Sequence, residues 1–280
     1  MITLPIDPEV VLGPLTLSWH GIFAALGILV GLALSRRFGQ ERDLDDDRLL
    51  GLAMAIVFAG VVGARALYLL EHEPGDLLRP AEWLGTNGFS FYGALVAGAV
   101  VAIVYVWRVG VGLIYADAVA AGFGLAMAVG RVGDVLIGEH FGQPSDLPWA
   151  IRYTDPEARV PSTEIAYHPG ALYEGLLGLL IFAAIWPRRH HFPHPGALLA
   201  TVVGLYALGR FVIFFWRVDS ETLVAGLNGA QLISLGLVAA SAAALVIIRR
   251  LAPRRRAGPG GRRTLRRNSK SRSGRRIPGA

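Results

Sequence analysis

Long apolar stretches alternate with short charged segments along most of the chain. Each stretch has about the length that a helix needs to cross the ~30 Å hydrocarbon core of a membrane. Because such stretches recur, we expect the first to be a retained membrane helix and not a cleaved signal peptide. The pattern predicts an all-α polytopic membrane protein with about seven transmembrane helices. The predicted spans cover about residues 17–35, 48–70, 89–107, 112–137, 170–186, 196–216 and 229–248.

The arginines between the spans predict how the helices are oriented. Most of them fall on alternate connections, and the cytoplasmic loops of membrane proteins carry an excess of Lys and Arg. We therefore expect the N-terminus outside, the C-terminus in the cytoplasm and the long connection 138–169 outside. The cytoplasmic set is Arg36, Arg37, Arg42, Arg48, Arg108, Arg188, Arg189 and the C-terminal tail, and the outside set is Arg79, Arg152, Arg159 and Arg217.

Composition separates a membrane-embedded body from a basic tail. Of all residues 53% are hydrophobic and 17% charged, while residues 249–280 hold 13 of the 27 Lys and Arg residues and no acid. We expect residues 1–250 to form a seven-helix transmembrane domain and residues 251–280 to be a disordered cytoplasmic tail that touches anionic lipids. The tail lacks interleaved aromatic residues, so no nucleic-acid partner is expected. The absence of cysteine excludes disulfides, thiolate metal sites and a cysteine nucleophile in the chain.

Several ionisable residues interrupt the apolar spans. A charge at mid-bilayer costs a few kcal/mol, so such residues usually face an interior cavity or a charged partner. Arg131 and Asp134 are three residues apart on one helix face, and Tyr206 and Arg210 are four apart on another. Buried ion pairs that fix helix register are the alternative interpretation. The set is Arg65, Asp117, Arg131, Asp134, Glu139, Glu174 and Arg210.

Arginines inside a membrane protein indicate a phosphate ligand. A guanidinium keeps its proton and presents a planar fork that matches phosphate oxygens. An arginine-lined cavity that opens to lipid is therefore predicted to bind a phospholipid headgroup. The histidines lack the spacing of a zinc-binding motif, so no zinc site is expected.

The stretch GRVGDVLIGEHFGQPSDLPWAI, residues 130–151, places three charged residues at the end of the fourth predicted span. It resembles the signature of the bacterial prolipoprotein diacylglyceryl transferase family, in which a Gly-Arg-x-Gly-Asn-x-x-x-Gly-Glu pattern precedes an Asp-Leu-Pro-Trp. Other stretches resemble the family in the same order, namely SWHGI, GARALYLL, HPGALYEGL, GLYALGRFVIFFWRVD and GLNGAQLISL. The resemblance covers about residues 15–245.

The resemblance implies an enzyme of lipoprotein maturation in the bacterial plasma (inner) membrane. Such an enzyme transfers the diacylglyceryl group of phosphatidylglycerol to the thiol of a lipobox cysteine in a prolipoprotein signal peptide. A thioether forms and glycerol phosphate leaves. The sulfur comes from the substrate, which fits a chain without cysteine, and the reaction needs no metal or nucleotide.

The resemblance also implies roles for individual residues. Arg131 and Arg210 match family arginines and are predicted to bind the phosphate and stabilise it as it leaves. Glu139 matches the signature glutamate, which either orients an arginine or binds the glycerol hydroxyls. The other candidates for substrate binding are Asp134, Gly138, Gly142, Tyr206 and Arg65. A purely structural role is an open alternative for Arg65, Tyr206, Glu174 and Gln231.

Four positions depart from the family pattern. His20 stands where the family usually has tyrosine, and Tyr92 stands where it has a histidine that is often considered the catalytic base. If both positions face one cavity, we expect His20 to take the thiol proton, because histidine titrates near ~6.5 and a phenol near ~10. His20 and Tyr92 are thus both candidate catalytic residues, and hydrogen bonding by both, with neither as the base, is the alternative. Asp134 replaces an asparagine and Phe214 a glutamate, which suggests that one acidic partner has moved.

Two other function classes are compatible with an arginine-lined membrane cavity. A lipid transporter or flippase would act without a covalent product, although no duplicated halves are visible in the sequence. A non-catalytic lipid-binding scaffold would keep its function after Arg131 and Arg210 are replaced by alanine.

Overall fold

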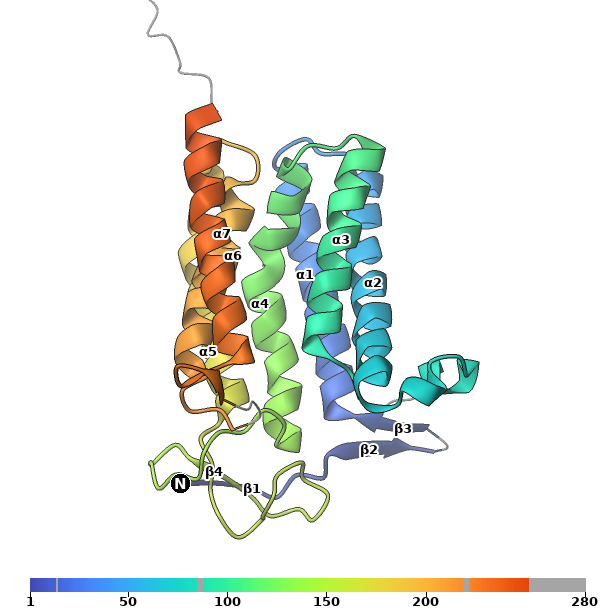
Figure 1. Ribbon diagram of the computed structural model, residues 1–280, viewed down its shortest axis with the longest axis vertical. Coiled ribbons are helices and arrows are strands. Elements are labelled where there is room, and N and C mark those ends of the chain that lie inside the picture. Colours follow the sequence, from blue (N-terminus) through green and yellow to red (C-terminus); the bar gives the residue numbers. More distant parts are fainter. Residues whose placement is uncertain (14, 85–87, 219–221, 252–280) are drawn as a thin grey trace, which may run out of the picture.

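The computed structural model describes residues 1–13, 15–84, 88–218 and 222–251. Most of these residues belong to helices that run roughly along the long axis of the molecule (Figure 1). The α-helices are α1 (Trp19–Gln40), α2 (Asp46–His72), α3 (Phe91–Val109), α4 (Ile114–Ile137), α5 (Gly170–Ile185), α6 (Ala197–Ile213) and α7 (Gly229–Leu251). The shorter elements are β1 (Ile2–Leu4), β2 (Glu9–Leu12), β3 (Leu15–Ser18), β4 (Ile151–Tyr153), β5 (Thr222–Val224), β6 (Leu227–Asn228), η1 (Pro74–Asp76), η2 (Pro80–Leu84) and η3 (Trp186–His191).

The helices confirm the predicted all-α polytopic membrane fold. Among the described residues, six helices are long and apolar enough to cross a membrane, counting α5 together with η3 as one. The remaining helix, α6, is apolar but has 17 residues. It is shorter than the predicted span 196–216 because the chain leaves the helix at Phe214 and turns, with the amide of Trp216 bonded to the carbonyl of Ile213.

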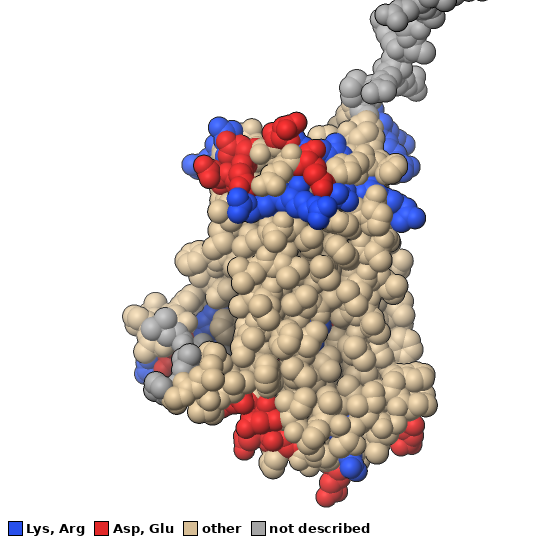
Figure 2. All heavy atoms as spheres, turned by 180° about the vertical axis from the view of Figure 1, so that it is seen from behind, with Lys and Arg blue, Asp and Glu red and all other residues tan. Residues whose placement is uncertain are grey.

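Charged side chains gather at the two ends of the molecule. Figure 2 shows a broad and mostly uncharged band between these ends on the face that it presents. The N-terminus and the C-terminal end of α7 lie at opposite ends (Figure 1). Which end faces the cytoplasm stays a prediction from the arginine pattern. Of the predicted basic tail 251–280, residues 252–280 lie outside the described residues.

Local sequence signals explain where several helices begin and end. The Ser18 side chain accepts the amide of Gly21 at the start of α1, and Asp45 accepts the amide of Arg48 at the start of α2. Such side chains satisfy amides that have no partner in the first helical turn. At the other end, α3 stops at Gly110, whose φ of 70° is a left-handed conformation that glycine adopts readily.

Helix α4 is the centre of the bundle. It packs against α1, α5 and α6, while α2 pairs with α3 and α6 with α7. The contact between α1 and α4 requires glycine, because a Cβ at Gly133 would lie 2.5 Å from the carbonyl oxygen of Trp19 and 2.9 Å from Cα of His20. This close approach brings the start of α1 against the polar end of α4.

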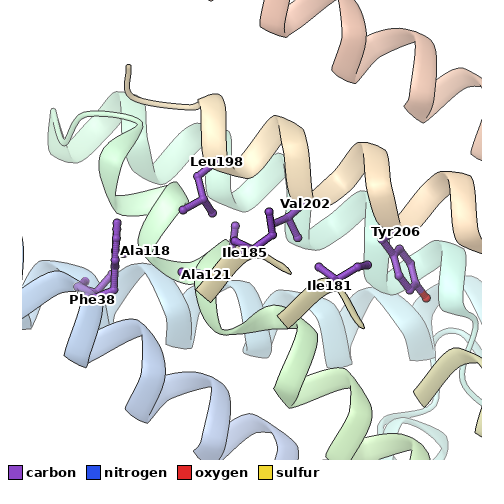
Figure 3. Close-up of a cluster of buried hydrophobic side chains, with 10 residues drawn as sticks. Phe38, Ala118, Ala121, Ile181, Ile185, Leu198, Val202 and Tyr206 are labelled. Atoms are coloured by element: carbon purple, nitrogen blue, oxygen red, sulfur yellow. The ribbon is translucent and has the colours of Figure 1, made fainter. Parts of the chain in front are cut away.

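A cluster of buried apolar side chains joins α1, α2, α4, α5 and α6 (Figure 3). Tyr206 lies at one end of the cluster, and its hydroxyl points away from the apolar side chains. The ring therefore belongs to the core while the hydroxyl is available to polar neighbours. The labelled members are Phe38, Ala118, Ala121, Ile181, Ile185, Leu198, Val202 and Tyr206.

Asp117, one of the ionisable residues within the predicted spans, has a structural role. Its carboxylate is 1% exposed and accepts the backbone amides of Gly196 and Leu199, each at 2.8 Å. These amides belong to the start of α6, whose first-turn donors would otherwise lack partners. Asp117 therefore fixes α6 to α4. This contact supports a structural role for Asp117 and not a role in ligand binding.

The short strands were not predicted from the sequence. Strands β2 and β3 form an antiparallel hairpin before α1, and β1 pairs in parallel with β4 from the long connection after α4. The amino group of Met1 donates to the carbonyl of Pro148 at 2.6 Å. The N-terminal segment is thus tied to the connection that follows the polar end of α4.

Candidate functional site

The last turns of α4 place an arginine and an aspartate on one buried face. Nη1 of Arg131 lies 2.5 Å from Oδ2 of Asp134, and the two side chains are 11% and 3% exposed. The spacing of three residues within a helix brings them together, as the sequence predicted. Charges this deeply buried need partners, and the other partners come from elements far away in the sequence.

Glu174 of α5 forms ion pairs with three arginines. Its side chain is fully buried. Oε2 lies 2.5 Å from Nη2 of Arg131, while Oε1 accepts Nη1 of Arg210 at 3.1 Å and Nη1 of Arg217 at 3.2 Å. Removing a carboxylate and three guanidinium groups from water is unfavourable unless they contact one another closely. Helices α4, α5 and α6 are joined at this point by a single carboxylate.

His20 extends the network to α1. Its Nδ1 lies 2.5 Å from Oδ1 of Asp134 and 3.5 Å from Oε2 of Glu139, and its side chain is 49% exposed. An imidazole held by a buried carboxylate on Nδ1 presents Nε2 to its surroundings. Because Asp134 also binds Arg131, the histidine and the arginines belong to one continuous set of contacts.

Glu139 lies just after the end of α4 at the outer part of the network. Helix α4 ends at Gly138, whose φ of 78° is left-handed, and the chain then reverses direction. Oε1 of Glu139 accepts Nη1 of Arg159 at 3.1 Å, while Oε2 faces His20. The carboxylate therefore links the connection 138–169 to α1.

Arg217 and His140 belong to the network although they were not among the predicted site residues. Arg217, which the sequence placed among the outside loop charges, is 6% exposed and bound to Glu174. Its Nη2 also donates to Nδ1 of His140 at 3.0 Å, and Nε2 of His140 lies 3.9 Å from Oδ2 of Asp134. His140 has a φ of 60°, which is uncommon for a residue other than glycine. The sequence signal that could have indicated His140 was its place in the charged turn directly after Gly138.

The connection 138–169 covers this end of the bundle. A Cβ at Gly142 would lie 2.4 Å from the carbonyl oxygen of Trp216, so the glycine permits the close approach of two loop backbones. The Tyr153 hydroxyl donates to the carbonyl of Val135 at 2.8 Å, and burial raises the pKa of this hydroxyl, with Asp134 adding to the effect. Tyr153 therefore stays neutral and holds the connection on α4.

An apolar cavity of about 530 Å³ lies beside the network, among α1, α2, α3, α4, α6 and α7. Among the described residues, Arg210 is its one charged lining residue, and Tyr206 and Tyr92 are two of its few polar ones. Nη1 of Arg210 donates to the Tyr206 hydroxyl at 3.2 Å. A smaller recess of about 250 Å³ is lined by His20, Arg131 and Asp134.

His20 and Tyr92 line the two different recesses. The recesses share wall residues on α1 and α4, so they are neighbours. The predicted role of His20 depends on both positions facing one cavity. In the structure they face two adjacent recesses: His20 lies with Arg131 at the smaller one, and Tyr92 lies with Arg210 at the larger one. The shared wall residues are Ile28, Phe123, Ala126 and Met127.

Arg65 is directed to a different part of the chain. Nε of Arg65 donates to the carbonyl of Glu82 at 2.8 Å, and its Nη1 donates to the carbonyl of Gly88 at 3.1 Å. These contacts hold the connection between α2 and α3. The structure therefore brings together Arg131, Asp134, Glu139, His20, Tyr206 and Arg210, while the substrate-binding role of Arg65 remains a prediction.

Comparison with known proteins gives a consistent result. A family model described as prolipoprotein diacylglyceryl transferase matches residues 9–247. Among curated relatives, the phosphatidylglycerol–prolipoprotein diacylglyceryl transferase of Thermosynechococcus vestitus is 33% identical over 238 residues, which cover 81% of this chain and 87% of the relative. The protein of the same name from Bordetella bronchiseptica is 31% identical over 249 residues, covering 85% of this chain and 93% of the relative.

Proposed function

The chain belongs to the prolipoprotein diacylglyceryl transferase family, and from this premise we propose that it transfers a diacylglyceryl group from phosphatidylglycerol to a prolipoprotein. In the proposed reaction, the thiol sulfur of a lipobox cysteine attacks the glycerol carbon that carries the phosphate. A carbon–sulfur bond forms, the carbon–oxygen bond to the phosphate breaks, and glycerol phosphate leaves. The thiol proton must be removed as negative charge develops on the leaving phosphate.

The observation that carries this proposal is the convergence of three arginines on Glu174 beside an apolar cavity. The cavity offers an apolar space for acyl chains, and Arg210 lines it. Within the described residues, the buried Nε of Arg131 has no hydrogen-bond acceptor. A buried donor without an acceptor is unfavourable, and a phosphate oxygen would satisfy it with a charge-assisted hydrogen bond.

His20 is the proposed base. A neutral imidazole that donates Nδ1–H to Asp134 has its lone pair on Nε2, where it can take the thiol proton. Asp134 would orient the ring and stabilise the imidazolium, as a carboxylate does in other histidine-dependent sites. Tyr92 lines the neighbouring cavity and is proposed to contact the lipid there.

The other predicted residues support the same site. Glu139, which faces both His20 and Arg159, would set the position of the imidazole or bind the glycerol hydroxyls. Gly138 and Gly142 allow the covering connection to fold back over this end. The donor is a membrane lipid and the acceptor carries an apolar signal peptide, so both would reach the cavity from the bilayer.

We further propose that the protein lies in the bacterial inner membrane with this end outside. The arginine pattern supports that orientation, because the connections at the other end carry the larger number of arginines. Binding of the basic tail to anionic lipids belongs to the same proposal and concerns residues outside the described part of the chain.

Mass spectrometry of a lipobox peptide tests the proposed reaction. The peptide is incubated with purified protein in phosphatidylglycerol liposomes, beside a peptide whose cysteine is replaced by serine and beside the Arg131→Ala protein. The expected result is a diacylglyceryl mass gain that needs both the thiol and Arg131. No gain with folded wild-type protein, while a known family enzyme is active in parallel, would contradict the proposal and direct attention to lipid transport.

A further inference from the structure

Phe214 occupies a central position among the arginines of the network. Its ring centroid lies 4.5 Å from Cζ of Arg210 and 4.9 Å from Cζ of Arg217. The residue is 4% exposed and is the C-cap of α6. Its amide bonds to the carbonyl of Arg210 at 3.0 Å, and its carbonyl accepts Nδ2 of Asn228 at 3.4 Å. The ring is therefore held in a fixed place.

The two arginines that contact this ring also share one oxygen. Both reach Oε1 of Glu174, at 3.1 and 3.2 Å, so two like charges lie close together in a buried site. Like charges repel each other strongly where water is excluded. The face of an aromatic ring carries partial negative charge and attracts a guanidinium, and this attraction grows when the groups are desolvated.

An aromatic ring attracts these arginines without adding a formal charge. Among the described residues at the buried centre of the network, three carry a guanidinium group, Arg131, Arg210 and Arg217, and two carry a nearly inaccessible carboxylate, Asp134 and Glu174. One positive charge is thus in excess within this set. A carboxylate at position 214 would also hold the arginines but would cancel the excess and weaken attraction to an anion.

We propose that Phe214 is a positioning residue that orients Arg210 and Arg217 and, because it is uncharged, preserves the excess positive charge that binds a phosphate. The proposal rests on the proposed function for the identity of the ligand as the phosphate of phosphatidylglycerol. It concerns binding of the anion and not removal of the thiol proton, so it predicts a change in KM that is larger than the change in kcat.

The kinetic test compares Phe214→Leu with Phe214→Tyr and with a matched control, Phe215→Leu. Phe215 is the next residue, 52% exposed, and its ring packs against Phe211. Loss of the ring at 214 is expected to raise KM for phosphatidylglycerol about tenfold with a smaller change in kcat. Tyrosine keeps a ring face and should retain the wild-type KM within about twofold, as should the control.

A charge test uses Phe214→Glu alone and together with Asp134→Asn. The single variant should raise KM more than Phe214→Leu, because it removes the excess positive charge. The double variant restores that charge and should recover KM, while kcat stays low because Asp134 also holds His20. A wild-type KM for Phe214→Leu, or a double variant whose KM is no better than that of Phe214→Glu, would overturn the proposal.

A binding measurement separates this inference from the transfer reaction. The melting temperature of each variant is recorded in detergent with and without added glycerol phosphate. We expect the ligand-induced rise to be reduced in Phe214→Leu and Phe214→Glu and kept in Phe214→Tyr and Phe215→Leu. If wild type shows this rise but no transfer, the proposed reaction fails while the inference stands. Equal rises in all variants contradict the inference whatever the activity.

Discussion

Two glutamates at opposite ends of the bundle each contact several basic side chains, but one glutamate is buried and the other is partly exposed. Glu174 is fully buried and contacts Arg131, Arg210 and Arg217. Glu41, at the end of α1, accepts two hydrogen bonds from Arg189 at 2.8 Å each, and Arg37 and His190 lie at 3.4 and 3.0 Å. Its side chain is 27% exposed.

The difference shows what burial adds to a cluster of charges. The hydrogen bonds from Arg189 lower the pKa of Glu41 to about 2, so this carboxylate stays ionised and joins α1 to η3 at the polar end of the molecule. Water and salt weaken such exposed pairs, and each stabilises a protein by at most about 1 kcal/mol. The side chains around Glu174 are buried, which is costly for stability alone but is what an anion-binding catalytic site requires.

The largest effect is expected from Glu174→Ala. This change leaves three buried guanidinium groups without their shared carboxylate, and removing one partner of a buried charge pair costs about 3–5 kcal/mol. Denaturation in detergent should show a loss of that size, and Glu41→Ala should lose far less. Equal losses would show that burial does not distinguish the two clusters.

Arg131→Lys should impair the reaction while leaving the fold intact. Lysine keeps the positive charge but lacks the planar fork that reaches Asp134 and Glu174 together. Loss of one donor to a developing anion typically reduces kcat about 10²–10³-fold, and we expect a reduction of that order in peptide transfer. Arg37→Lys at the exposed cluster is the control and should transfer at the wild-type rate.

His20→Phe and Asp134→Asn test the proposed base. Each should lower kcat about 100-fold, and the double variant should be little worse than either, because the two side chains act as one unit. Rates measured with saturating lipid give kcat directly. An active His20→Phe variant would show that another group takes the thiol proton.

The smallest effect is expected from Glu41→Gln. The pKa of Glu41 is lower in the folded protein, so its ionised form stabilises the fold above its ordinary value of 4.5, and this contribution disappears as the pH falls toward 2. The melting temperatures of wild type and variant should differ slightly at pH 7 and converge near pH 2. A difference that grew as the pH fell would contradict the assigned contact with Arg189.

The sequence predicted the helices well because spanning a bilayer imposes a length and an apolar composition on each of them. It also paired Arg131 with Asp134 and Tyr206 with Arg210, since helical spacing fixes those neighbours. The meeting of Glu174 with three arginines could not be predicted, because it depends on how α4, α5 and α6 pack. The same applies to Arg217, whose position after α6 resembled an exposed loop.

The measurement that tests the central claim most directly is the initial rate of transfer to a lipobox peptide by Glu174→Gln and Glu41→Gln, assayed side by side in phosphatidylglycerol liposomes. Both changes remove one charge and keep the size of the side chain. If Glu174 holds the three arginines in the positions that bind the phosphate, a neutral amide should hold them less well. Glu174→Gln should then be slower than wild type by about 100-fold or more despite the added net positive charge, with Glu41→Gln within about twofold. Wild-type transfer by folded Glu174→Gln, or equal losses in both variants, would contradict the assignment of this network as the phosphate site.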